Sequence, residues 1–137
     1  MITKEELATT LNGREYGDEI TKGEEILAKQ SGLVVMFGYS DDNVELRGAI
    51  DDEIGAYDGT IISFLNGEIL QNECGEEECP YFQKLKENPA VKTVEAIWDN
   101  GEYDWTFKTD IPHATFEVVE DGEKSCRGIV FDVASIK

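Results

Sequence analysis

The sequence is poor in basic residues: 12 Lys and Arg stand against 30 Asp and Glu, which gives a formal net charge of −18. Because contacts to phosphate groups depend on Lys and Arg, this balance argues against direct binding of nucleic acid or of an anionic membrane surface. No apolar run approaches the roughly 20 residues that a membrane-spanning helix needs. The first residues, MITKEELATTL, lack the basic and apolar regions of a signal peptide. We therefore expect a cytoplasmic protein without a membrane partner.

Signals of catalysis are equally scarce. The single histidine is the only candidate base for a cysteine nucleophile, and the sequence has no glycine-rich phosphate loop and no zinc-deaminase pattern. Asp51, Asp52 and Glu53 could belong to a two-metal nuclease site. However, successive residues of a strand point to opposite faces, so at most two of these carboxylates could share one site. We predict a protein that is not an enzyme, with a metal-dependent nuclease as an alternative.

Two helices are expected at the N-terminus. Residues 3 to 11 predict the first, because Thr3 and Glu6 match the S/T-x-x-E capping box and an asparagine–glycine pair follows as a stop signal. The box recurs at Thr21, and this second helix is expected to run to about residue 31. Acidic side chains in both helices argue against a helix-turn-helix that reads DNA.

After residue 32 the pattern changes to short strands separated by turns. LVVMFGY and TIISFL are continuous apolar runs, whereas VELRGAI alternates apolar and polar residues. Asn66-Gly67 is the strongest of several hairpin signals. Pro80 opens a short helix, PYFQKLKEN. The predicted fold class is α+β, with two N-terminal helices, a mainly antiparallel sheet of six to eight strands and one short inserted helix, in a single domain over residues 1–137.

Three cysteines and one histidine raise the question of a metal site. A single disulfide would leave an odd thiol, and the cytosol disfavours such bridges. Structural zinc sites often combine three Cys with one His, and the spacing in NECGEEECPYF suits the first pair of ligands. We therefore predict a closed, structural zinc site without an open position for water, formed by Cys74, Cys79, His113 and Cys126.

This ligand set has a weakness, because an antiparallel hairpin after His113 would carry Cys126 to its far part. The site needs sheet curvature or an irregular stretch to close. Two alternatives stay open: a site that uses only the pair Cys74 and Cys79 with other ligands, and no metal at all. In the latter case Cys126 would be a small buried hydrophobic residue and His113 an ordinary hydrogen-bonded one.

Acidic residues are concentrated in one part of the sequence. Residues 40 to 80 contain twelve acids and one base, Arg47. Such a density makes a strong local field, although a highly charged soluble surface is the ordinary explanation. Alternation along VELRGAI predicts that Glu45 and Arg47 face solvent, with Val44, Leu46 and Ile50 on the other side. The best candidate acidic face comprises Asp41, Asp42, Glu45, Asp51, Asp52, Glu53 and Asp58, followed by Glu73, Glu76, Glu77 and Glu78.

Four stretches carry a resemblance: GREYGDEITKGEE, GYSDDNVELRGAIDDEIGAY, KTDIPHATFEVVEDGEK and CRGIVFDV. They resemble a family of small acidic proteins from phages and prophages of Gram-positive bacteria, over most of the chain. By class, size and its Cys/His set, the chain also resembles anti-CRISPR proteins of the type II-A class, one of which contains zinc. The resemblance implies a non-enzymatic inhibitor in the host cytoplasm. It would bind a type II CRISPR nuclease at its basic nucleic-acid channel and block loading of guide or target DNA. No residue-level site follows from it.

A second function remains open, namely a phage protein that sequesters a nucleotide signal. Anionic nucleotides need a basic pocket, for which the candidates are Arg14, Arg47, Arg127 and some lysines. Affinity that falls steeply with salt would favour the inhibitor, whereas stabilisation by cyclic nucleotides would favour the nucleotide binder. The sequence leaves the target nuclease, the blocked step and the oligomeric state open.

Overall fold

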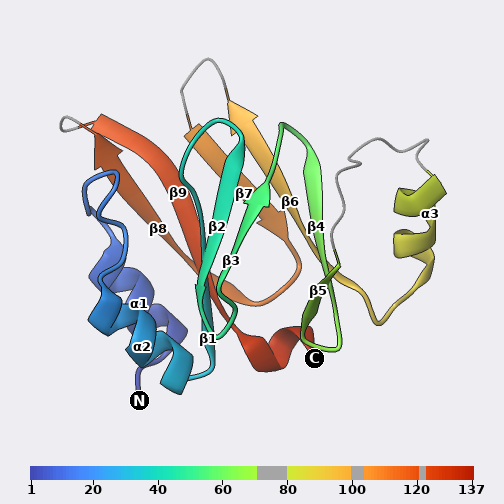
Figure 1. Cartoon of the computed structure of the whole chain (residues 1–137), viewed down its shortest axis with the longest axis horizontal. Coiled ribbons are helices and arrows are strands. Elements are labelled where there is room, and N and C mark those ends of the chain that lie inside the picture. Colours follow the sequence, from blue (N-terminus) through green and yellow to red (C-terminus); the bar gives the residue numbers. More distant parts are fainter. Residues whose placement is uncertain (71–79, 100–103, 121–122) are drawn as a thin grey trace.

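The computed structural model describes residues 1–70, 80–99, 104–120 and 123–137. These residues form nine strands in two antiparallel sheets, three α-helices and a C-terminal 3-10 helix (Figure 1). The predicted α+β class and the antiparallel pairing are thus confirmed. The prediction of one sheet with six to eight strands differs from the structure, because the strands divide between two sheets that pack on each other.

The two N-terminal helices begin where the capping boxes predict. Helix α1 spans Lys4–Leu11 and helix α2 spans Lys22–Gln30. In each, the threonine before the helix accepts the amide of a glutamate three residues later, and that glutamate in turn caps the threonine amide. Helix α1 packs on β8 and β9, and α2 packs on β2 and β1, so the helices cover one face of the first sheet.

The first sheet has five strands in the order β3-β2-β1-β9-β8. Its strands are β1 (Leu33–Gly38), β2 (Asn43–Gly48), β3 (Asp52–Gly55), β8 (His113–Glu120) and β9 (Glu123–Asp132). All six residues of β1 are buried. A strand buried on both faces reads as a continuous apolar run, because the helices lie on one side of it and the second sheet on the other.

The second sheet has four strands in the order β5-β4-β6-β7. They are β4 (Thr60–Leu65), β5 (Glu68–Leu70), β6 (Lys92–Asp99) and β7 (Asp104–Thr109). The β4–β5 hairpin turns at Asn66 and Gly67, which both have positive φ angles of 55° and 86°. This is the geometry that an asparagine–glycine pair favours in a two-residue hairpin, and it confirms the sequence signal.

The two sheets are joined by aromatic side chains. Phe64 of β4 meets Phe131 of β9 edge to face, with ring centroids 5.8 Å apart. Trp105 of β7 lies so close to Gly38 that a Cβ atom at this glycine would be 1.8 Å from the indole ring. Because Gly38 has no side chain, the indole ring can pack against the end of β1.

Helix α3 (Pro80–Glu87) begins at the proline, as predicted, and lies beside the second sheet, beyond β4 and β5 (Figure 1). The 3-10 helix η1 (Val133–Ile136) follows β9, and the carbonyl of Ile136 accepts the amide of Gly67 at 2.7 Å. No helix in the described parts of the chain is long and apolar enough to cross a membrane.

Candidate functional site

Two acidic turns lie next to each other at one end of the sheets, namely the β1–β2 turn and the β3–β4 turn. The amide of Ala56 donates to the carbonyl of Asp42 at 2.6 Å, which ties the two turns together. The indole nitrogen of Trp105 donates to the carbonyl of Ser40 at 2.6 Å, and the amide of Tyr57 donates to Thr60 Oγ1 at 2.7 Å. The turns are therefore held by hydrogen bonds to each other and to the second sheet.

These turns expose aromatic side chains beside carboxylates. Tyr39 is 40% exposed and Tyr57 is 67% exposed, which makes them two of the four large apolar side chains exposed in the described residues. Tyr39 stacks on Tyr16, with ring centroids 5.5 Å apart. Asp41, Asp42 and Asp58 are exposed on the same two turns. We call this surface, formed by Tyr39, Asp41, Asp42, Tyr57 and Asp58, the acidic end.

The acidic surface continues along the edge strand β3. Asp51, Asp52 and Glu53 are all exposed there. The Asp52 side chain accepts the amide of Glu53 at 2.8 Å. A backbone donor of the edge is thus occupied by a side chain of the same strand, and the edge carries charge, which are two ways in which proteins discourage strand addition. A partner would therefore meet the side chains of β3 more readily than its backbone.

Arg47 is surrounded by carboxylates. It forms ion pairs with Glu25 of α2 at 3.0 Å, with Glu45 at 3.2 Å and with Asp51 at 3.0 Å. The predicted alternation is confirmed, since Val44 and Leu46 are fully buried. The predicted solvent exposure of Glu45 is wrong, because its side chain is only 13% exposed: it lies on the sheet face that α2 covers.

Burial has an electrostatic consequence for Glu45. Loss of solvent is the main cause that raises the pKa of its carboxyl above the ordinary 4.5, and the negative charges of Glu53, Glu19 and Asp51 raise it further. The charge of Arg47 acts in the opposite direction. Glu45 thus lies behind the acidic surface and is not one of its exposed carboxylates.

The other two arginines also form ion pairs with carboxylates. Arg14 binds Glu24 through two hydrogen bonds of 2.7 and 2.6 Å, and this pairing lowers the pKa of Glu24 and raises that of Arg14. Arg127 lies 3.5 Å from a carboxylate oxygen of Glu117 and donates to Thr106. All three arginines considered for binding a nucleotide therefore already face carboxylates.

Of the four predicted zinc ligands, the structure describes the strand positions of two, His113 and Cys126. Cys74 and Cys79 lie outside the described residues, as do Glu73, Glu76, Glu77 and Glu78. In the β8–β9 register His113 lies opposite Phe131, whereas Cys126 lies opposite Val118. Along the strands, His113 and Cys126 are therefore separated by five residue positions, or roughly 17 Å.

This register does not fit one zinc ion that takes both His113 and Cys126, because ligand atoms lie only about 2.0–2.3 Å from zinc. The β8–β9 pairing thus separates the last two members of the four-residue set, and we do not expect His113 and Cys126 to share one zinc ion. Among the described residues no group of three or more His, Cys, Asp or Glu is arranged to hold a metal ion. A zinc site at Cys74 and Cys79 stays a prediction.

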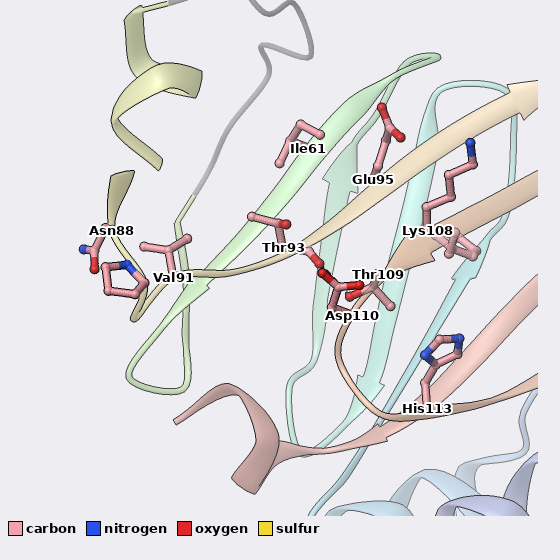
Figure 2. A pocket seen from close by; sticks show the side chains of 11 residues that line it. Ile61, Asn88, Val91, Thr93, Glu95, Lys108, Thr109, Asp110 and His113 are labelled. Carbon is pink, nitrogen blue, oxygen red and sulfur yellow. Dashed lines mark hydrogen bonds between the residues drawn. The ribbon is translucent and has the colours of Figure 1, made fainter. Parts of the chain in front are cut away.

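A cleft that the sequence did not reveal lies on the second sheet. It has a volume of about 740 Å³ and is formed by β4, β6, β7, the connection after α3 and the start of β8 (Figure 2). Figure 2 shows Asn88 and Val91 on one side of it and Lys108 and His113 on the other. Its lining residues are Ile61, Asn88, Pro89, Val91, Thr93, Glu95, Phe107, Lys108, Thr109, Asp110 and His113. No local pattern could have identified it, because these residues are brought together only by strand pairing.

Comparisons with known proteins add no family to this description: no protein-family model matches the chain, and no curated protein or solved structure matches it significantly. Function is therefore inferred from the charges, contacts and exposure of the described residues.

Proposed function

We propose that the chain is a non-enzymatic inhibitor that uses its acidic end to bind the basic, nucleic-acid-binding surface of another protein. In line with the resemblance to type II-A anti-CRISPR proteins, the proposed target is a type II RNA-guided nuclease, and the blocked step is loading of guide RNA or target DNA. A structural zinc at Cys74 and Cys79 would serve stability and not binding.

The charge distribution supports a basic partner. Arg47 is the only base in residues 40 to 80, and three carboxylates already surround it. Asp41 and Asp58 have no ion-pair partner among the described residues, and neither has Glu53. A net charge of −18 would draw the chain towards a positive channel, since complementary charge raises association rates.

The observation that carries the proposal is the exposure of Tyr39 and Tyr57 beside unpaired carboxylates on turns that hydrogen bonds hold in place. Tyrosine is among the residues that contribute most to protein interfaces. Turns that are already ordered lose little conformational freedom on binding, which favours affinity. An ordinary solvated acidic surface needs neither exposed tyrosines nor anchored turns.

The direct test is DNA cleavage by a streptococcal type II guide-RNA nuclease, with the chain added before guide, before DNA or after DNA. We expect inhibition that depends on the order of addition, because a competitor for the nucleic-acid channel acts only while the channel is open. The order of addition at which the chain no longer inhibits cleavage identifies the blocked step. No inhibition of several related nucleases at micromolar protein would overturn this target.

Variants connect the inhibition to the acidic end. The pair Asp41→Asn/Asp58→Asn and, separately, Tyr57→Ala should each raise the inhibitory concentration at least about tenfold, as expected when interface anchors are removed. The matched control is Glu68→Gln/Glu87→Gln, which changes the net charge equally at exposed positions elsewhere. Equal effects of the two double variants would show that only net charge matters and would contradict a specific site.

A further inference from the structure

The cleft contains ionisable side chains that the rest of the protein does not neutralise. Lys108, Glu95 and Asp110 line it, and none of them has an ion-pair partner among the described residues. Lys108 lies directly opposite Glu95 in the β6–β7 register, yet the two do not form an ion pair. Elsewhere Arg14 and Arg47 are both engaged with carboxylates. The cleft thus offers a ligand unpaired charges of both signs, whereas these two arginines are already paired.

His113 adds a defined hydrogen-bonding group. Its Nδ1 atom lies 2.6 Å from the carbonyl oxygen of Ile111. A carbonyl can only accept, so Nδ1 carries the proton in this contact. In the neutral ring Nε2 is then left as an acceptor, and the ring is part of the cleft wall (Figure 2). Neutral His113 can accept a hydrogen bond from a cationic group.

The remaining wall is partly apolar. Ile61 and Phe107 are almost completely buried beneath the cleft, and Pro89 and Val91 line it from the connection after α3. The volume of about 740 Å³ lies within the usual range of small-molecule sites, which combine apolar walls with a few placed polar groups. Such a wall suits an apolar side chain or ring of a ligand.

We infer that this cleft binds a small zwitterion, namely an amino acid with an apolar side chain. The ammonium group would face Asp110 and Nε2 of His113, and the carboxylate would face Lys108. Lys108 and Asp110 are two residues apart at the end of β7 and both line the cleft, which provides charges of opposite sign for one ligand head group. The apolar side chain would contact Val91 and Ile61.

A polyanionic nucleotide fits this cleft less well. Its phosphates would find one ammonium group, Lys108, and would meet the two carboxylates of Glu95 and Asp110. Like charges in contact cost free energy, and phosphate sites normally supply arginines or several backbone amides. The mixed charges of the cleft therefore favour a ligand that is neutral overall.

Calorimetric titration of the full chain can separate these possibilities with three matched probes: phenylalanine, phenethylamine and 3-phenylpropionate. The second lacks the carboxylate and the third lacks the ammonium. Because a charged hydrogen bond contributes about 1.5–3 kcal/mol, we expect phenylalanine to bind at least about tenfold more tightly than either fragment. Equal binding of all three, preference for one fragment, or no binding at millimolar concentration would each overturn the inference.

Two substitutions should act on different halves of the ligand. Lys108→Gln should weaken phenylalanine and 3-phenylpropionate but not phenethylamine, whereas Asp110→Asn should weaken phenylalanine and phenethylamine but not 3-phenylpropionate. The controls are Lys22→Gln and Asp18→Asn, exposed positions outside the cleft. All variants should keep the melting temperature of the unmodified chain, since neither cleft residue has an ion-pair partner. Equal losses for all probes would contradict the proposed orientation.

Discussion

At the acidic end hydrogen bonds hold the turns and every charged side chain is a carboxylate, whereas the cleft carries charges of both signs on Lys108, Glu95 and Asp110, none of which has an ion-pair partner in the described chain. The first surface is rigid and of one sign, which suits a large basic partner. The second is concave and of mixed sign, which suits a small neutral one. A net charge of −18 therefore does not by itself identify the ligand of either surface.

The largest effect is expected from a substitution that displaces Trp105, whose indole holds the acidic end in place. Gly38→Ala would place a Cβ atom 1.8 Å from the ring of Trp105, which also holds the carbonyl of Ser40. Because the tryptophan is buried and cannot move freely, we expect a loss of about 3 kcal/mol in the free energy of unfolding. Urea unfolding measures this loss.

The control for that substitution is Gly23→Ala in α2. A Cβ atom there has no neighbour within 4 Å. Alanine favours a helix over glycine, so this variant should gain up to about 1 kcal/mol. If both variants were equally stable, the close approach of Trp105 to Gly38 would be disproved.

A second pair of variants compares a base that is paired with carboxylates, Arg47, with the unpaired base of the cleft, Lys108. Arg47→Met removes the base that Glu45, Glu25 and Asp51 share, and we expect a loss of about 2 kcal/mol, less than for a fully buried pair because Asp51 is largely exposed. Lys108→Met should change stability by less than about 0.5 kcal/mol, because this lysine has no ion-pair partner. Thermal unfolding of both variants checks the difference. Similar losses would show that the ion pairs of Arg47 add nothing to stability.

The stability of the fold should depend on pH through the raised pKa of Glu45. Burial raises the pKa of Glu45 above 4.5 in the folded chain, so the folded state binds its proton more tightly than the unfolded state does. As the pH falls from 7 towards 4.5, the unmodified chain should therefore gain stability relative to Glu45→Gln. Unfolding in urea at several pH values would measure the difference between the two chains.

Glu24 should behave in the opposite way. Its hydrogen-bonded pairing with Arg14 lowers its pKa below 4.5, so its contribution is present above pH 4.5 and is lost as the pH falls through the folded-state pKa. Glu24→Gln is thus the natural control in the same experiment. A difference between unmodified chain and Glu45→Gln that did not change with pH would contradict the buried position of Glu45.

Zinc content separates the alternatives that remain for the cysteines. We expect about one equivalent of zinc per purified chain, lost in Cys74→Ser and in Cys79→Ser. The register of β8 and β9 predicts that at most one of His113→Gln and Cys126→Ser lowers the zinc content. Less than about half an equivalent of zinc, with Cys74→Ser as stable as the unmodified chain, would remove the zinc prediction.

Much of the local structure was predictable because it depends on neighbouring residues. The capping boxes at Thr3 and Thr21, the proline that opens α3 and the Asn66-Gly67 turn all appear where the sequence predicts them. The division into two sheets was not predictable in this way. It depends on contacts between distant strands, such as Phe64 with Phe131, for which no local pattern exists.

The same limit applies to the candidate sites. The sequence located the acidic residues Asp41, Asp42 and Asp58, whereas the exposure of Tyr39 and Tyr57 is seen only in the structure. It placed Glu45 on the open surface, because alternation shows which residues share a face but not what covers that face. The cleft was missed entirely, since its members come from five separate parts of the chain.

The sequence by itself determined the charge, the helix starts, the hairpin turns and the α+β class, because each of these depends on composition or on interactions within a few residues. Only the tertiary structure decided which carboxylates surround Arg47, how far His113 lies from Cys126, which tyrosines reach solvent and where the cleft forms. These features depend on register and on packing between layers, where residues far apart in the chain come within a few ångströms of one another.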